Sequence, residues 1–443
     1  MKVEVSIGEA IDKLTILELK MKKITDENKK IEIQKEINVL YDCQEYKTKY
    51  DFYYSLLMYV NEQIWDMTDI IKSIPIDNVN FSRISNEIFE FNQKRFRIKN
   101  WFNLLSDSNI KEQKSYSSSH CKVIVDSEDI FFDKLAEINY LAIEYDVLTF
   151  ESPIISTIND FLKIPTVVYD EEKIKLLNNP TTIYLNDFSI PVNTPYEVFS
   201  QKPITYICGG FFGDFIQSLS VVCEKFYETG RKGILYISNH RESFKCIENT
   251  YNDLYPIIKK QVYIQDFKLY NNESFEIDLS SWRDSNLLHK TNWYHIFKST
   301  YNIEWGKRKW LTNIKYDDNW KDKVVINTTT YRFPFNIDFN LLHTLHSENL
   351  IFISSNKSEH NYFENQTKLS IKYYEFKDFL ELTTIINSCK LFIGSLSAPL
   401  SIAHALHKPR ICGLTLMGNN ALDNIHNLEL DRFLPSITYC VVK

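Results

Sequence analysis

The stretch Pro203–Val222 reads PITYICGGFFGDFIQSLSVV, and it decides the fold of the larger part of the chain. A short apolar run of β-prone residues, Ile204–Cys208, predicts a strand. The turn after it is rich in glycine, and apolar residues then recur at helical spacing: Gly209, Gly210 and Gly213 in the turn, and Phe215, Leu219 and Val222 in the helix. A strand, a glycine turn and a helix form the opening βα unit of a nucleotide-binding or sugar-binding α/β domain.

Asp214 stands where this helix begins, and its position allows two interpretations. Aspartate is favoured as the N-cap of any helix, and this interpretation is the simpler one. The alternative is a carboxylate that faces a crevice at the carboxyl end of the strand. The glycines fit such a crevice, because backbone N–H groups can approach a ligand where no Cβ intervenes and because positive φ costs glycine little.

The length and charge of the chain limit the classes of protein to consider. With 443 residues, at about 150 residues per domain, the chain is expected to form two to four domains. Its 44% of hydrophobic residues is enough for ordinary packed cores. The formal net charge of -7 argues against nucleic acid as the main partner.

The eight cysteines are scattered along the chain and include no CxxC pair. This pattern fits neither a disulfide framework nor a zinc site, so we expect reduced thiols that lie mostly in the core. The N-terminal residues lack the apolar region of a secretion signal, and no stretch reaches the length of a membrane span. A cytoplasmic location is therefore expected.

The first 117 residues have the pattern of helices. Ser6 and Glu9 form a capping box, and apolar residues recur at steps of three and four along four segments: 6–24, 33–41, 50–71 and 84–105. Pro75 ends the third of these segments. We expect an all-α bundle over residues 1–117, with its glutamates and lysines on a solvated outer face.

This region also resembles an uncharacterised bacterial helical domain that has no established activity. The resemblance rests on three segments: SIGEAIDKLTILELK (6–20), VNEQIWDMTDIIK (60–72) and KEQKSY (111–116). It implies that the domain accompanies glycan assembly, and we expect it to serve in self-association or in docking a protein partner. A structural role is the simpler interpretation of the distinctive residues in these segments: Asp12, Lys13, Asn61 and Trp65.

After a short polar linker, strands alternate with helices, which predicts βαβ units and mostly parallel sheets. Strands are expected at 122–125, 147–150, 166–169, 182–185, 204–208, 233–237, 262–264, 323–327, 350–354, 390–393 and 410–414. The fold class is therefore α/β: an N-terminal all-α bundle (1–117) followed by two doubly wound Rossmann-like lobes (118–315 and 316–443). Ligands of such lobes bind outside the carboxyl ends of the strands.

Four of the seven tryptophans lie between residues 282 and 310: Trp282, Trp293, Trp305 and Trp310. Aromatic side chains at this density can form a wall on which a sugar stacks. A packed core or an inter-lobe pad is the more common arrangement and is favoured here.

Two segments of the α/β region resemble GT-B glycosyltransferases of the heptosyltransferase-like family: GGFFGDFIQSLSVV (209–222) and LFIGSLSAPLSIAHALHKPRICGL (391–414). That family has a GGLGD-type turn, whose aspartate lies beside the acceptor, and a second segment that holds the nucleotide diphosphate of the donor. Gly213 and Asp214 match the first motif; Gly394, Ser397, Pro399, Ala403, Ala405 and Pro409 match the second. The chain departs from the second motif at three positions: Leu396 replaces Asp, Ser401 replaces His and Ala398 replaces Gly.

The resemblance implies an inverting transfer of a sugar from a nucleotide-diphosphate sugar to a glycan or similar acceptor. Asp214 is the candidate base that takes the proton of the acceptor hydroxyl. The helix that starts after Pro399 offers N–H groups to the leaving diphosphate, together with backbone N–H groups around Ser397, and Arg332 could hold a phosphate or simply form a salt bridge. The expected binding set is Gly209, Gly210, Gly213, Thr328, Thr329, Arg332, Gly394, Ser395, Ser397, Ala398 and Pro399.

No cofactor and no metal ion are expected beyond the donor itself. Asp317 and Asp318 are adjacent carboxylates, but they fit a solvated turn better than a metal site. His404 has the spacing of a packed helix residue rather than of a base. A second function remains open, in which a catalytically inactive GT-B relative binds glycans or serves as a scaffold. The departure at Leu396 keeps this alternative in view.

Overall fold

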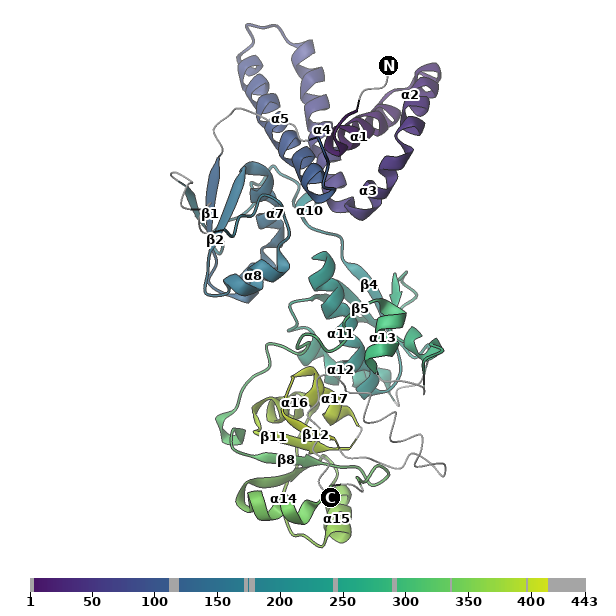
Figure 1. Cartoon of the computed structure of the whole chain (residues 1–443), viewed down its shortest axis with the longest axis vertical. Helices are drawn as coiled ribbons and strands as arrows, with labels where there is room; N and C mark the ends of the chain where they lie inside the picture. Colours follow the sequence, from purple (N-terminus) through teal and green to yellow (C-terminus); the bar gives the residue numbers. More distant parts are fainter. Residues whose placement is uncertain are drawn as a thin grey trace. The chain divides into compact units, whose positions relative to one another are not determined.

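The computed structural model describes residues 4–110, 119–170, 174, 180–241, 246–288, 293–334, 337–395 and 397–412. The chain forms two compact units, Met1–Gln201 and Lys202–Lys443 (Figure 1). None of the described helices is long and apolar enough to cross a membrane.

The first unit begins with the expected helices: α1 (Ile7–Lys23), α2 (Glu27–Val39), α3 (Gln44–Lys49), α4 (Asp51–Ser73) and α5 (Val79–Leu105). The Ser6 side chain accepts a hydrogen bond from the Glu9 backbone N–H, so the predicted cap of α1 is confirmed. Helices α1, α4 and α5 bury their apolar faces against one another, with Ile11, Leu57 and Ile98 fully buried. The periodic apolar residues thus form one helical core, as the pattern predicts.

A small parallel sheet completes the first unit. Its strands are β1 (His120–Ile124), β2 (Val147–Glu151) and β3 (Thr181–Tyr184), in the order β2-β1-β3. Helices α6 (Glu128–Asp133), α7 (Leu135–Glu144), α8 (Ile155–Phe161) and α10 (Tyr196–Phe199) belong to the same unit. The strand expected at 166–169 is reduced to a single bridge between Leu148 and Val167.

Helix α5 fastens this sheet to the helical bundle. The indole N–H of Trp101 donates to Thr166 Oγ1 at 2.7 Å in a buried contact, and Arg97 Nε donates to Asp146 Oδ1 at 2.6 Å. The expected boundary after residue 117 therefore divides one packed body. The sequence suggested that residues 118–201 belong to the same lobe as the next sheet, in a domain of residues 118–315. The structure shows that they do not. They form a sheet of their own, and their helices α7 and α10 pack against α5 and α4 of the bundle.

The second unit contains two parallel sheets, as expected for two Rossmann-like lobes (Figure 1). The first has the order β6-β5-β4-β7, from β4 (Ile204–Cys208), β5 (Gly233–Ile237), β6 (Ile264–Leu269) and β7 (Ile277–Asp278). The second has the order β10-β9-β8-β11-β12, from β8 (Val324–Asn327), β9 (Leu350–Ile353), β10 (Lys372–Tyr374), β11 (Leu391–Gly394) and β12 (Arg410–Cys412). Their helices are α11 (Phe212–Thr229), α12 (Ile247–Ile258), α13 (Trp293–Tyr301), α14 (Phe339–His346), α15 (Lys357–Thr367), α16 (Phe379–Ser388) and α17 (Ala398–Ala405).

Each sheet has a point at which the strand order reverses. In the first sheet the chain runs outward from β4 through β5 and β6, and then returns to place β7 on the other side of β4. In the second sheet it runs from β8 through β9 and β10, and then places β11 on the other side of β8. A crevice opens at such a point, outside the carboxyl ends of the two diverging strands. The fold therefore predicts one crevice beside β4 and another beside β8.

The tryptophan-rich segment packs inside the second unit. Trp305 and Trp310 are fully buried, and both rings lie against the ring of His404 on α17, with centroids 4.6 and 5.1 Å apart. The Trp310 indole N–H also donates to the Ile216 carbonyl on α11 at 2.8 Å. These side chains form a pad between the lobes, which was the favoured interpretation, and not an open wall for a sugar.

Candidate functional site

Asp214 lies in the first turn of α11 and is not its N-cap. The N-cap is Phe211, so the simpler interpretation of Asp214 as a cap is wrong. Gly210, with a φ of 105°, turns the chain early enough for the helix to begin at Phe212. The Asp214 carboxylate accepts a hydrogen bond from Arg283 Nη2 at 2.8 Å, and its side chain is 28% exposed. Asp214 is thus a charged group at the switch point of the first sheet.

The glycine turn is packed closely by the chain itself. The Gly209 backbone N–H donates to Ser280 Oγ at 2.9 Å. A Cβ on Gly209 would lie 2.9 Å from the Ser238 carbonyl oxygen, and one on Gly210 would lie 2.1 Å from Arg283 Nη2. Both positions therefore require glycine for close approach of the chain's own groups.

Three further charged residues and a histidine gather at the same edge of the first sheet, and they were not predicted from the sequence. His240 and Arg241 follow β5, while Asp278 ends β7 and Asp284 follows it. Asp278 accepts from His240 Nε2 at 3.2 Å, and Arg241 Nη2 pairs with Asp284 Oδ2 at 2.6 Å. The hydrogen bond to Asp284 is the largest cause of a raised pKa at Arg241. Their positions at or just after strand ends were the available signal, and the sequence-based prediction followed that signal only at β4, β8 and β11.

The predicted threonines and Ser395 lie together at the switch point of the second sheet. Strands β8 and β11 are paired in register, with Asn327 opposite Gly394. Thr328 and Ser395 directly follow these residues and are almost completely buried, at 1% and 0% exposed. Among the described residues, Thr329 Oγ1 and Ser395 Oγ are buried polar atoms with no hydrogen-bond partner. Buried polar atoms of this kind call for an explanation, and a bound polar ligand provides one.

Arg332 lies in the turn that follows Thr329. Its backbone N–H donates to the Thr329 carbonyl at 3.3 Å, and its guanidinium carbon lies 5.5 Å from the centroid of the Tyr331 ring. Arg332 is thus held near the end of β8, as the sequence suggested.

The first turn of α17 begins slightly earlier than predicted, at Ala398 rather than after Pro399. Ser397 is the N-cap in an extended conformation, and Ala398 and Pro399 open the helix. The Ser397 hydroxyl makes no cap hydrogen bond and donates instead to the Ser395 carbonyl at 3.2 Å. The helix start therefore has no side-chain cap among the described residues, and its N–H groups favour an anion. Leu396, the departure from the family motif, lies outside the described residues.

Helices α11 and α17 bring the two halves of the site together. They pack against each other, and Gly213 lies at the contact. A Cβ on Gly213 would lie 3.2 Å from Ser401 Oγ and 3.4 Å from Ala398 Cα. The turn that carries Asp214 thus adjoins the uncapped start of α17.

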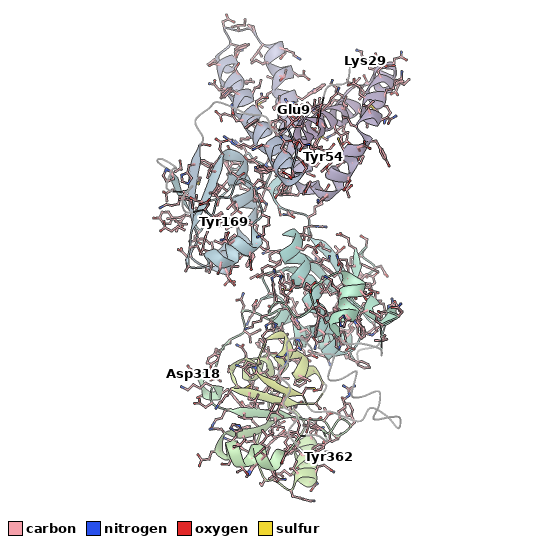
Figure 2. The ribbon with its side chains drawn as sticks, viewed as in Figure 1. Glu9, Lys29, Tyr54, Tyr169, Asp318 and Tyr362 are labelled. Atoms are coloured by element: carbon pink, nitrogen blue, oxygen red, sulfur yellow. The ribbon has the colours of Figure 1, made fainter. Side chains whose placement is uncertain are left out.

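Other candidates from the sequence lie elsewhere or are packed. Asp317 is the N-cap of a short 3-10 turn, and the exposed Asp318 follows it at the surface (Figure 2). His404 is fully buried, and burial holds its pKa well below the usual value. Cys208 precedes the glycine turn, but burial raises the pKa of its thiol, which makes it a poor nucleophile. The described part of the chain contains no group of three or more His, Cys, Asp or Glu side chains that could hold a metal ion.

The comparisons with known proteins give a different result for each part of the chain. Residues 1–128 match a family of unknown function (DUF6165), which confirms the expected uncharacterised helical domain. A search of curated proteins finds no match.

Solved structures similar to this chain include proteins of the expected heptosyltransferase-like kind. A family 9 glycosyltransferase from Veillonella parvula has 9% identity and a TM-score of 0.36, over 54% of this chain and 88% of that one. The E. coli heptosyltransferase WaaC with ADP-2-deoxy-2-fluoro heptose has 9% identity and a TM-score of 0.35, over 54% of this chain and 93% of that one. The dodecameric glycosyltransferase TibC from enterotoxigenic E. coli has 12% identity and a TM-score of 0.34, over 53% and 69%.

Proposed function

We propose that the second unit transfers a sugar from a nucleotide-diphosphate sugar to a hydroxyl group of a glycan or similar acceptor. The proposal rests on the residues of this chain. Residues predicted from the sequence lie at the switch points of both sheets, which is where ligands of such folds bind. The transfer is proposed to be inverting, as the resemblance of the two sequence motifs implies. It is also proposed to be independent of a metal ion, because the sequence has no D-x-D metal motif in a convincing place.

The observation that carries the proposal is the uncapped start of α17 beside buried, unpaired hydroxyl groups. Ser395 Oγ and Thr329 Oγ1 are buried without partners among the described residues, and Ser397 leaves the first turn of α17 uncapped. A diphosphate would accept hydrogen bonds from these hydroxyls and from the helix N–H groups, and the helix dipole would favour its negative charge. Such donors stabilise the charge that builds on the leaving diphosphate during transfer.

Asp214 supplies the second requirement of the reaction. The acceptor hydroxyl must lose a proton as it attacks the anomeric carbon, and a carboxylate near the donor can accept that proton. Asp214 follows Gly213, which contacts the start of α17. A base on α11 would therefore stand beside a donor held at α17.

The test compares the rates at which variants release nucleoside diphosphate from nucleotide sugars. Asp214→Asn keeps the size of the side chain but removes the base, so we expect a loss of at least about 100-fold in turnover. Asp318→Asn is the matched control, because Asp318 is an exposed aspartate in a turn that precedes the amino end of β8, whereas the predicted site lies beyond its carboxyl end. Equal rates for the two variants and the unaltered chain would contradict the role of Asp214.

The same variant separates the proposed enzyme from the alternative of an inactive glycan-binding or scaffold protein. A scaffold would bind its glycan equally well with Asp214→Asn and would show no turnover in either form.

The proposal that residues 1–117 mediate self-association or docking is tested by sedimentation of the unit 1–201. A monomer at high concentration would exclude self-association through this unit.

A further inference from the structure

The Arg283 side chain lies against the glycine turn. Its Nη2 atom donates to Asp214 Oδ2 at 2.8 Å, and its guanidinium carbon lies 4.2 Å from the centroid of the Trp282 ring. The same Nη2 atom occupies the place where a Cβ on residue 210 would project. The Arg283 side chain is only 13% exposed. It is thus enclosed between an aromatic ring, a carboxylate and a bare backbone.

Gly210 is best explained by this arginine. Its φ of 105° is a conformation that side chains rarely adopt, and a Cβ there would lie 2.1 Å from Arg283 Nη2. From the sequence alone, the glycines were expected to let a ligand approach the backbone closely. At Gly210 the approaching group in the structure is a guanidinium of the protein itself.

Aromatic packing and hydrogen bonds fix the backbone next to Arg283. Trp282 is 6% exposed and packs on Trp293 with ring centroids 4.4 Å apart. The Trp282 backbone N–H donates to the Tyr301 hydroxyl at 3.2 Å, and that hydroxyl donates to the Asp278 carbonyl at the same distance. A side chain held this firmly can set the direction of the carboxylate that it binds.

We propose that Arg283 is the positioning residue of the candidate base, and that it orients the Asp214 carboxylate toward the acceptor hydroxyl. This inference rests on the proposed function. The arginine does not touch the reacting atoms in this proposal: it acts through Asp214, and Gly210 admits it. A poorly aimed base lowers the rate of the chemical step by up to about 100-fold without weakening the binding of the donor.

The experiment measures kcat and KM across pH 5–9 for whichever of the ADP-, UDP-, GDP- and dTDP-linked sugars the intact chain turns over fastest. The variants are Arg283→Gln, Arg283→Lys and Asp214→Asn. The matched control is Arg231→Gln. Arg231 also pairs with a carboxylate, Glu276 at 3.1 Å, but it does so at the amino ends of β5 and β7, on the opposite edge of the same sheet.

Arg283→Gln is expected to lower kcat at least tenfold with KM changed less than about twofold. It should also move the acid limb of the pH profile to higher pH, because loss of a neighbouring positive charge favours a protonated carboxylate. Arg283→Lys should recover part of kcat, since lysine keeps a positive charge beside the Asp214 carboxylate. In an Asp214→Asn background the Arg283→Gln change should have no further effect on kcat.

Two failures are distinguishable. If the intact chain turns over a donor and Arg283→Gln behaves as Arg231→Gln does, the inference about Arg283 is wrong and the proposed function stands. If the intact chain turns over no donor, the proposed function fails and the inference fails with it. Circular dichroism and melting temperature of each variant separate a loss of fold from a loss of positioning.

Discussion

Gly210 shows at the scale of one residue how a backbone conformation and a side chain depend on each other. Gly210→Ala should lower the free energy of unfolding by about 1–2 kcal/mol, since alanine is strained at positive φ. It should also displace Arg283, because its Cβ would lie 2.1 Å from that side chain. Urea unfolding and turnover of nucleotide sugars measure the two effects.

Gly230→Ala provides the control for this prediction. Gly230 ends α11 with a φ of 74°, so alanine there carries a similar strain far from Arg283 along the helix. We expect both variants to lose stability and only Gly210→Ala to lose activity. Equal activity of the two variants would show that turnover does not depend on the position of the Arg283 guanidinium beside Gly210.

The sequence indicated Asp214, one residue of the Asp214–Arg283 pair, but it did not indicate Arg283. Asp214 stands in a motif whose glycines mark a turn, so a single stretch of sequence indicated it. Arg283 lies 69 residues further along the chain. Only the order of the strands, with β7 beside β4, brings it to the same edge. Pairing of strands that are distant in sequence is not readable from local pattern.

At the scale of elements, α1 is held to α4 and α5 by a buried polar network. Asp12, which is 2% exposed, accepts from Arg95 Nε at 2.9 Å and from Asn61 Nδ2 at 3.0 Å. Asp12→Ala should lower the local free energy of unfolding by about 3 kcal/mol, because it removes one partner of a largely buried ion pair. Hydrogen exchange of the three helices in the intact chain measures the change.

Lys13→Ala is the neighbouring control. Lys13 pairs with Glu36 at 2.9 Å, but both side chains are at least half exposed. Solvent screens a surface ion pair so that it contributes little to stability, and exchange in this variant should therefore change little. The structural interpretation of Asp12 from the sequence would be contradicted if both variants behaved alike.

His404, a buried histidine on α17, should make the stability of the second unit depend on pH. Burial, with smaller contributions from Arg410 and His407, holds the pKa of His404 well below its usual 6.5. The unfolded chain therefore binds a proton that the folded chain excludes. His404 therefore does not lower the free energy of unfolding above about pH 6.5. Below that pH, the free energy of unfolding falls by about 1.4 kcal/mol per pH unit.

Urea unfolding of the intact chain at pH 5, 6, 7 and 8 tests this dependence. His404→Gln should flatten the loss of stability below pH 6.5, whereas His343→Gln, which changes a partly exposed histidine on α14, should not. An unchanged slope with His404→Gln would mean that other groups cause the dependence. His407 belongs among them, because burial also lowers its pKa.

At the scale of the whole molecule, the first unit should need residues beyond 117 for its stability. Trp101 is 3% exposed, and its indole N–H bonds to Thr166, which a chain ending at 117 lacks. We expect residues 1–201 to unfold with a free energy at least about 2 kcal/mol higher than residues 1–117, from burial of that side chain alone. Equal melting temperatures would favour the boundary first drawn from the sequence.

The sequence predicted most elements and the fold class, because apolar periodicity reports directly which faces are buried. It placed strands such as Val324–Asn327 within one residue of their observed bounds. It missed the boundary between the units, because that boundary depends on contacts of α5 with residues 140–200 and not on composition. It overstated the strand at 166–169, where the β-prone residues make one bridge only.

The central claim is that the second unit binds a nucleotide-diphosphate sugar at the start of α17. The most direct measurement is the melting temperature of the intact chain with ADP, UDP, GDP, CMP and dTDP and with their sugars. A ligand that binds only the folded chain stabilises it by about 2.7 kcal/mol at 100 times its dissociation constant. We expect a clear rise in melting temperature with one nucleoside diphosphate. A folded sample that shows no rise with any of them would contradict it.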